Sequence, residues 1–435
     1  MNKTFKTIIA AKDRVKFNLL ALPDTKAFKI EVVFDYGSNL EDLFYKKYGK
    51  KVYGISHLTE HLSFKSPEGY GSDEILALLK KRGNRNASTG YTHINYYFNS
   101  IMEHMDFGID AITKIAYNDF SRITDEEFES EKAVVMSEVG RYNDDSQTMF
   151  NLSVKSVLKG TDKDDNILGT VDILKDITLE DCKKIKALAL QEALVWFNIT
   201  YDPMEGVSED DVLNSIESVL YNLDTVWQEV EIGKKEYDKT ISIKKGDLTL
   251  ENKSDRAIID LTFETDTNIY VRSLMNKYVG SLANETSLYN LIRDKHGLTY
   301  GVSFGKDDMN NVDYTRLIVD VEPDKVDFTM ELIEDAIVKC NEKFSREIFE
   351  ELFENRRLNI TMDRSDPKSY GFLFVIQVDN PKMLDRSIDI LEDDLSKIDK
   401  VLDDEFITFE IAKQYMNDLA EIVKNKSYTK VTSTK

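Results

Sequence analysis

The sequence is poor in cysteine and has no long hydrophobic run. It has 2 cysteines, Cys182 and Cys340, among 435 residues. So few cysteines argue against a secreted scaffold held by disulfides and are typical of a reducing compartment. No run of 18 apolar residues occurs, and charged residues soon break the apolar stretch near the N-terminus. We therefore expect neither a transmembrane helix nor a signal peptide, and interpret the chain as soluble and cytoplasmic.

Negative charge exceeds positive charge in this chain. The 57 lysines and arginines are outnumbered by 79 aspartates and glutamates, which gives a formal net charge of −22. This balance argues against nucleic-acid binding, because phosphate contacts need a basic face. Apolar residues make up 41% of the chain and aromatic residues 10%. These amounts suffice for hydrophobic cores, and the length indicates two large domains.

Histidine is rare, yet two of the 5 histidines fall within one short segment, His57-Leu58-Thr59-Glu60-His61. Positions i and i+4 lie on one face of a helix, so His57 and His61 can reach one metal ion, with Glu60 beside them. The order H-x-x-E-H is that of the inverted zinc peptidases. The same spacing also occurs at the polar edge of ordinary amphipathic helices. A metal site therefore needs a further ligand.

A third ligand is available further along the chain. Thr124 and Glu127 have the spacing of a capping box, which predicts a helix that begins at residue 125. Glu131 and Glu138 follow on nearly the same face of that helix. Their separation of roughly 10 Å along the axis is too long for both to bind one ion easily. One glutamate is then a ligand and the other a supporting group, or the helix is an ordinary acidic one.

Together these segments resemble the pitrilysin/insulinase family of zinc metallopeptidases. His61 and Glu138 are separated by 76 residues, the separation expected in that family. The resemblance implies one Zn²⁺ per chain, with His57, His61 and Glu138 as ligands. It implies Glu60 as the general base and Glu131 as a catalytic-site residue that supports the metal without binding it.

Residues 83–98 extend the resemblance, because they look like the family's active-site edge strand and its partner. In such enzymes the substrate docks in extended form on that edge by strand addition. We expect Asn86, Ala87 and Ser88 to form the docking edge. Without the resemblance, the segment would be interpreted as an ordinary hairpin with a polar turn.

Residues 291–303 resemble the family's C-terminal signature, with Arg293 and Tyr300 as its substrate-binding and catalytic pair. A guanidinium can hold a substrate carbonyl or carboxylate, and a phenol can donate to a developing oxyanion. In the implied chemistry, zinc activates its water and polarises the scissile carbonyl, and Glu60 carries the proton to the leaving amine. By the resemblance, zinc and Tyr300 would share the negative charge that develops on the carbonyl oxygen, and no acyl-enzyme would form.

The fold that the resemblance implies is α+β, with two related domains, each a mostly antiparallel sheet with helices packed on one face. We assign residues 1–223 to a zinc-binding catalytic domain and 224–245 to a linker. Residues 246–435 are assigned to a related domain without metal, which carries the Arg/Tyr pair.

Local patterns predict the elements of both halves, and Leu40 to Val52 is expected to be a loop. A faint internal repeat is compatible with duplication, since Thr124 and Ser345 both begin capped helices at an offset of 221 residues. Strands are expected at 28–34, 194–200, 257–264, 298–304 and 314–321, and helices at 72–82, 104–118, 125 onward, 210–223 and from 324 onward.

The sequence therefore predicts a zinc-dependent metalloendopeptidase that hydrolyses short or unfolded peptides. At this length the chain resembles half of the family's clamshell, so two chains would enclose a chamber, as a homodimer or as a heterodimer with a related chain. The main alternative is a non-catalytic assembly or peptide-binding subunit of the same fold. The presence of Glu60 argues against it, because a binding subunit does not need a general base. A structural zinc protein is the weaker alternative, because three ligands leave one position open.

Overall fold

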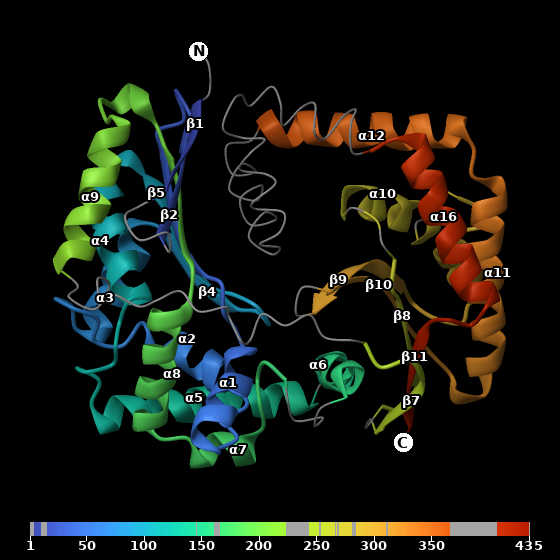
Figure 1. Ribbon diagram of the computed structural model, residues 1–435, viewed down its shortest axis with the longest axis horizontal. Coiled ribbons are helices and arrows are strands. Elements are labelled where there is room, and N and C mark those ends of the chain that lie inside the picture. Colours follow the sequence, from blue (N-terminus) through green and yellow to red (C-terminus); the bar gives the residue numbers. More distant parts are fainter. Residues whose placement is uncertain are drawn as a thin grey trace. The chain divides into compact units, whose positions relative to one another are not determined.

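The structure of the chain is a computed structural model, and it contains two compact units that are considered separately (Figure 1). The first unit includes the described residues within Met1–Arg141, Asp164–Lys239 and Arg364–Ile398. The second includes those within Tyr142–Lys163, Thr240–Asp363 and Asp399–Lys435. None of the helices in the described ranges has the length and hydropathy of a membrane span. The structure describes residues 4–9, 15–144, 146–160, 166–222, 243–251, 254–265, 267, 269–280, 284–309, 312–365 and 407–434.

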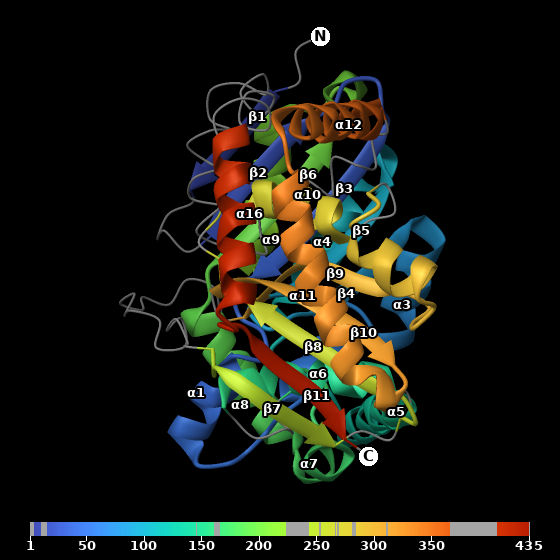
Figure 2. The ribbon, with the colours of Figure 1, turned by 90° about the vertical axis from the view of Figure 1, so that its right-hand side faces the viewer.

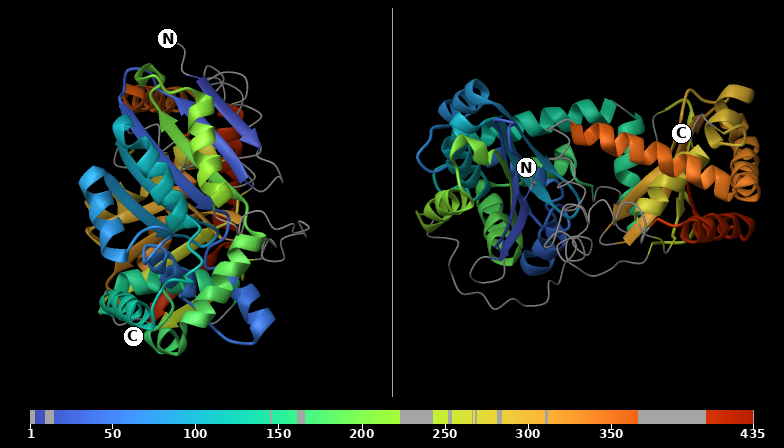
Figure 3. Two further views of the ribbon diagram at one scale, coloured as in Figure 1. Left: turned by 90° about the vertical axis from the view of Figure 1, so that its left-hand side faces the viewer. Right: turned by 90° about the horizontal axis from the view of Figure 1, so that it is seen from above.

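The first unit is built on a six-stranded sheet with the strand order β1-β2-β6-β3-β5-β4. Helix α4 packs on β3 and β5 and also contacts α9, and the left view of Figure 3 looks onto this helical side. The elements are β1 (Thr4–Ile9), β2 (Val15–Ala21), β3 (Ala27–Phe34), α1 (Leu40–Tyr48), α2 (Ile55–Leu62), α3 (Ser72–Arg82), β4 (Asn84–Thr89), β5 (Ile94–Ile101), η1 (Met102–His104), α4 (Met105–Ala116), α5 (Asp125–Asp144), α7 (Val171–Asp176), α8 (Leu179–Glu192), β6 (Val195–Tyr201), η2 (Pro203–Glu205) and α9 (Glu209–Asn222).

The second unit is built on a five-stranded sheet with the order β7-β11-β8-β10-β9. Figure 2 shows α11 and α16 next to each other on the side of this unit that faces the viewer. The elements are α6 (Ser146–Lys159), β7 (Gly246–Glu251), β8 (Ala257–Phe263), α10 (Ile269–Gly280), η3 (Asn290–Lys295), β9 (Val302–Met309), β10 (Val312–Val321), η4 (Pro323–Lys325), α11 (Val326–Lys343), α12 (Arg346–Ser365), α16 (Phe409–Lys424) and β11 (Thr429–Thr434).

The two sheets share one topology. In the first, β2 pairs in parallel with β6, and β6, β3, β5 and β4 follow in antiparallel pairs. In the second, β7 pairs in parallel with β11, and β11, β8, β10 and β9 follow in antiparallel pairs. Five consecutive strands of each unit therefore have the same spatial order and directions, to which β1 adds a sixth strand in the first unit. This confirms the expected α+β fold with two related, mostly antiparallel domains.

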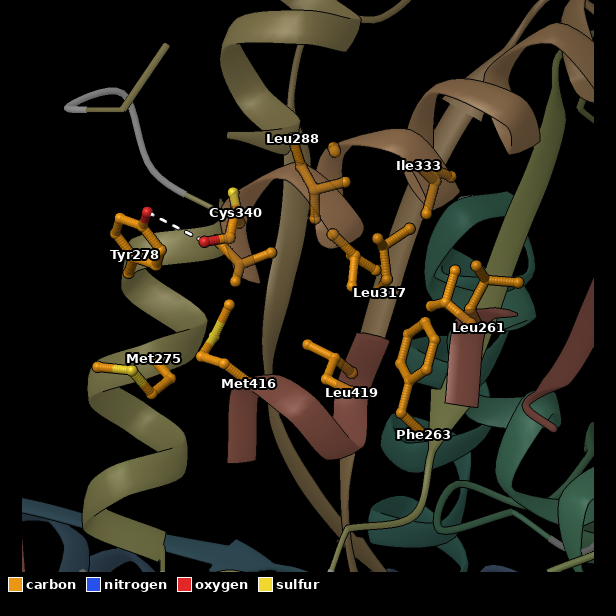
Figure 4. Packing of buried hydrophobic residues seen from close by; sticks show 14 of the residues in the cluster. Leu261, Phe263, Met275, Tyr278, Leu288, Leu317, Ile333, Cys340, Met416 and Leu419 are labelled. Carbon is orange, nitrogen blue, oxygen red and sulfur yellow. Dashed lines mark hydrogen bonds between the residues drawn. The ribbon is translucent and has the colours of Figure 1, made fainter. Parts of the chain in front are cut away.

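The core of the second unit lies between its sheet and its helices. Leu261, Phe263 and Leu317 of the sheet are fully buried against helical residues such as Met416 and Leu419 (Figure 4). Burial of side chains of this size stabilises the unit by about 1.5–3 kcal/mol for each. Alternation along the strands places these residues on one face of the sheet, so the other face is left for polar side chains.

Leu40 to Val52 was expected to be a loop, and this was wrong. Residues Leu40–Tyr48 form helix α1, which ends at Gly49 with a left-handed φ of 70°. Leu40 and Phe44, one turn apart, are fully buried, so the apolar side chains do have helical spacing. The polar residues between them concealed this short pattern.

Most other predicted elements are confirmed within two or three residues, and two differ. The strand expected from residue 298 begins only at Val302, because the Thr299 hydroxyl accepts a bond from the Gly301 amide (3.3 Å) and favours a turn. The region after residue 324 is helical as expected but ends in the strand β11, which was missed.

The two related helix starts are confirmed at α5 and α12. The linker expected at 224–245 lies almost entirely outside the described residues.

Candidate metal centre

Helix α2 carries the H-x-x-E-H motif, and Gly54 and Glu41 together fix the start of this helix. Gly54 precedes the helix with a φ of 87°, and a Cβ at this position would collide with the carbonyl oxygen of Leu168. Only glycine fits there. The carboxylate of Glu41 accepts hydrogen bonds from the backbone amides of Gly54 (3.1 Å) and Ser56 (3.0 Å). It thereby satisfies N–H groups that an unpaired helix start would leave open.

The two histidines of α2 meet Glu138 of α5. The ring centroids of His57 and His61 are 4.8 Å apart, with the rings nearly perpendicular at 89°. Glu138 Oε2 lies 4.0 Å from His57 Nε2 and 3.6 Å from His61 Nε2. The ligand atoms of the three residues all lie within 4.8 Å of one another, and no second His/Cys/Asp/Glu group of this kind occurs among the described residues.

This donor set fits a zinc ion. With metal–ligand distances of about 2.0–2.1 Å, neighbouring ligand atoms of a tetrahedral zinc lie about 3.4 Å apart. The separations of 3.6 and 4.0 Å from Glu138 are close to this value. Two imidazoles and one carboxylate leave a fourth position open, which is the pattern of a catalytic site rather than a structural one.

Glu131 contacts His61 on the side of the ring opposite to Glu138. Its Oε1 lies 2.9 Å from His61 Nδ1, and its Oε2 forms an ion pair of 2.7 Å with Lys65. A neutral His61 that donates from Nδ1 has Nε2 free for a metal. Spacing alone left open which glutamate binds and which supports, and the resemblance implied Glu138 as the ligand. The contacts favour Glu138 as the ligand and Glu131 as the orienting group.

Burial and neighbouring charges shape the protonation of these groups. Burial, reinforced by His61, lowers the pKa of His57 to about 3, so that His57 is neutral, as a metal ligand must be. Burial acts to lower the pKa of His61 too, but the hydrogen bond with Glu131 and the nearby carboxylates raise it overall. Burial acts to raise the pKa of Glu131, but its bonds with His61 and Lys65 lower it overall.

Glu60 lies on α2 beside this group and is 9% exposed. The hydroxyl of Thr89, the last residue of β4, donates a hydrogen bond of 2.7 Å to Glu60 Oε2. Burial raises the pKa of Glu60, against the opposing effects of Thr89 and His61. A raised pKa suits a carboxylate that must hold a proton during a reaction cycle. Thr89 was not predicted as a site residue.

The candidate docking residues lie on β4, the last strand in the order of the first sheet. Burial alternates along this strand, with Asn86 and Ser88 exposed and Ala87 and Thr89 half-buried. Since successive side chains of a strand point to opposite faces, Asn86 and Ser88 share one face, and Thr89 points to the other face with Ala87. The expected position at a sheet edge is confirmed, and a docking role stays a prediction.

Arg293 and Tyr300 form a pair of their own in the second unit. The Arg293 guanidinium carbon lies 4.7 Å from the ring centroid of Tyr289 and 5.1 Å from that of Tyr300. Tyr300 is 88% exposed and lies between η3 and β9. Such cation–π stacking holds both side chains at the surface. Their proposed role toward a substrate stays a prediction.

Sequence reasoning missed two residues that support the site. Glu41 was placed in an expected loop, and Thr89 is a β-branched residue that fits any strand. Only the fold brings Glu41 to the start of α2 and Thr89 to Glu60, across 15 and 29 positions of the chain. A polar residue at the end of an expected edge strand was the available signal for Thr89.

Two family models match consecutive parts of the chain. Residues 19–191 match the family Insulinase (Peptidase family M16), and residues 206–355 match the family Peptidase M16 inactive domain. The chain has two related α+β units, and the first carries the H-x-x-E-H motif on α2. It belongs to the pitrilysin/insulinase family of peptidases, in its half-size form.

Solved structures agree on the fold. A protease from Helicobacter pylori is 16% identical with a TM-score of 0.76, and the match covers 100% of both chains. A peptidase M16 inactive domain from Pseudomonas fluorescens is 15% identical with a TM-score of 0.74, covering 99% of this chain and 97% of the other. The periplasmic protease PqqL from Escherichia coli is 14% identical with a TM-score of 0.67; the match covers 100% of this chain and 46% of PqqL. No curated protein matches the chain.

Proposed function

We propose that the protein is a zinc-dependent endopeptidase that hydrolyses short or unfolded peptides. One observation carries this proposal. His57, His61 and Glu138 bring their ligand atoms within 4.8 Å of one another, and Glu60, a group that can carry a proton, lies on the same helix. Family membership supports peptidase chemistry at this site.

The residues of the chain have distinct roles in the proposed reaction. His57, His61 and Glu138 would hold the zinc. When bound, zinc would lower the pKa of a water molecule and polarise the substrate carbonyl. Glu60 accepts the proton of the attacking water and returns it to the leaving amine. Thr89 binds one carboxylate oxygen of Glu60 at 2.7 Å and keeps the other directed for this transfer.

The substrate is proposed to dock as an extra strand on β4, where backbone groups pair regardless of sequence. Arg293 and Tyr300 would contribute hydrogen-bond donors to the substrate and its oxyanion. A half-size chain would work as a homodimer, or as a heterodimer with a related chain, around a chamber. We assign the protein to the cytoplasm in this proposal, because Cys182 and Cys340 are both free and buried.

The direct test is digestion of an unstructured peptide mixture, read by mass spectrometry, with the wild-type protein and with Glu60→Gln. Cleavage by the wild type alone is expected. Light scattering during size-exclusion chromatography determines the oligomeric state of the same sample. Zinc-loaded wild type that cleaves nothing, as a dimer or after addition of a related chain, would refute the proposal.

A second candidate is a peptide-binding or assembly subunit without catalysis. It is favoured by one comparison, the Pseudomonas fluorescens protein that is described as an inactive domain and has nearly the same length. A chain of this type would bind peptides without cleaving them. The same digestion, combined with a peptide-binding measurement, separates the two candidates.

Removing the Thr89 hydroxyl is expected to slow cleavage without disturbing the metal. Thr89→Val keeps the shape and the strand preference of the side chain but loses the bond to Glu60. We expect kcat to fall about 10-fold, with KM and zinc content unchanged, because the loss of a hydrogen bond to a charged group costs about 1.5 kcal/mol. Thr89→Ser, which keeps the hydroxyl, serves as the matched control and should stay near the wild type. An unchanged kcat in Thr89→Val would exclude the positioning role.

A further inference from the structure

A chain of hydrogen-bonded polar side chains crosses the first sheet on the face opposite to α4. Ser88 of β4 donates to Asn95 Oδ1 on β5. Asn95 Nδ2 donates to Glu31 Oε1 on β3 (2.8 Å), and Asn198 Nδ2 of β6 donates to Glu31 Oε2 (3.4 Å). Asn18 Nδ2 of β2 donates in turn to Asn198 Oδ1 (2.8 Å). Five adjacent strands each contribute one member.

Four members of this polar chain are buried, and one is exposed to solvent. Glu31 is 1% exposed and Asn95 8%, whereas Ser88 is exposed on the edge strand. A buried carboxylate is costly unless donors satisfy it. Lys29, 3.8 Å from Glu31, adds a favourable charge. The proposed reaction at the metal centre assigns no role to these groups.

Glu31 sets the direction of every hydrogen bond that leads to Ser88. A carboxylate only accepts hydrogen bonds, so Asn95 must direct its NH₂ group toward Glu31. The amide oxygen of Asn95 then faces β4, where it can only accept. Ser88 must therefore give its single proton to Asn95. The remaining capacity of Ser88 Oγ is that of an acceptor.

We propose that Ser88 is a specificity-determining contact that selects peptides with a hydrogen-bond donor side chain at the docked position beside it. The inference rests on the proposed docking of peptides along β4. A strand added there would bring one peptide side chain onto the face of Ser88, with Cβ atoms about 4.5–5.5 Å apart. Glu31 acts through Asn95 and is a positioning residue.

Binding of a matched pair of neutral peptides tests this inference. The pair differs only in serine against O-methylserine, which keeps the acceptor oxygen but has no donor. The serine is moved through successive positions of a short fluorescein-labelled peptide. Anisotropy is measured with zinc-loaded Glu60→Gln protein, so that cleavage does not interfere. We expect one position at which serine binds about 5- to 10-fold more tightly, the effect of one hydrogen bond.

Two variants, each made in the Glu60→Gln protein, separate hydrogen bonding from size. Ser88→Ala should bring the two affinities within about 2-fold, because the acceptor is gone. Glu31→Gln leaves Ser88 in place but offers Asn95 both a donor and an acceptor, so that Asn95 is no longer held in one orientation. The preference should fall in the same way. Asp35→Asn removes a carboxylate from the end of the same strand and is the matched control that should keep the preference.

The outcomes distinguish this inference from the proposed function. Equal binding of both peptides at every position, or a preference that survives in Ser88→Ala, overturns the inference even where the wild type cleaves peptides. A preference that depends on Ser88 and Glu31 supports the inference even where the wild type cleaves nothing and the peptidase proposal fails. Absence of binding to any peptide overturns it as well.

Discussion

Replacing Glu60 by glutamine is expected to lower kcat for peptide cleavage about 10³-fold, while zinc stays bound. The amide has the size of the carboxylate and can still accept the hydrogen bond from Thr89. It cannot take a proton from the attacking water. Proton transfer by a positioned side chain contributes about 10²–10⁴-fold to a rate. KM should change little, because the carboxylate is needed in the transition state rather than for binding.

The control for this variant is Glu129→Gln, the same substitution on the exposed side of α5, where Glu129 pairs with Lys132. It should leave kcat and zinc content unchanged. Steady-state kinetics on one fluorogenic peptide and metal analysis of the same preparations provide the comparison. A Glu60→Gln protein with more than a tenth of the wild-type kcat would contradict the role of Glu60 as the general base.

Replacing Arg316 by methionine is expected to destabilise the second unit by about 3–5 kcal/mol. Arg316 Nε donates to Asp260 Oδ2 (2.7 Å), and its other nitrogens bond Asp307 (3.3 Å) and Asn151 of α6 (3.4 Å). Asp260 is fully buried and Arg316 is 8% exposed. Removal of one partner leaves a buried charge without compensation, which is the costly way to break such a pair.

The matched control is the double variant Asp260→Leu/Arg316→Met, which replaces both charges by apolar groups and should recover much of the lost stability. Lys339→Met removes an exposed ion pair with Asp335 and should have little effect. Hydrogen exchange of the full chain at increasing urea, measured by mass spectrometry on peptides that contain Asp260 or Arg316, reports the change in the second unit. A single Arg316→Met variant as stable as the wild type would show that the pair is not an essential part of this unit.

The part of the site that lies on α2 and at the start of α5 could be predicted from the sequence, because it depends on spacings of only a few residues. His57 and His61 lie one helical turn apart, and the capping box at Thr124 fixed the start of α5, both confirmed by the structure. The choice between Glu131 and Glu138 could not be made from spacing alone. Their shared helix face predicts only that both point toward one side. Their contacts with opposite nitrogens of His61 depend on how α5 packs against α2.

The remaining features depend on contacts between distant parts of the chain. Helix α1 was missed because its apolar pattern is short, although Glu41 on it caps α2. The polar chain from Asn18 to Ser88 joins strands that are adjacent only in the folded sheet. Asn18 and Asn198 are 180 positions apart. Isolated polar residues within strands do not predict such pairing, because sequence patterns predict that each of these side chains faces solvent.

His57, His61 and Glu138 are proposed to form a zinc site, with Glu131 as its support. Calorimetric titration of zinc into chelator-stripped protein tests this proposal most directly. We expect one zinc per wild-type chain. Glu131→Gln should weaken binding about 10- to 100-fold, as loss of an orienting partner does, and Glu138→Gln should weaken it more. Wild-type protein that fails to bind zinc, or Glu138→Gln that binds it as tightly as the wild type, would contradict the account.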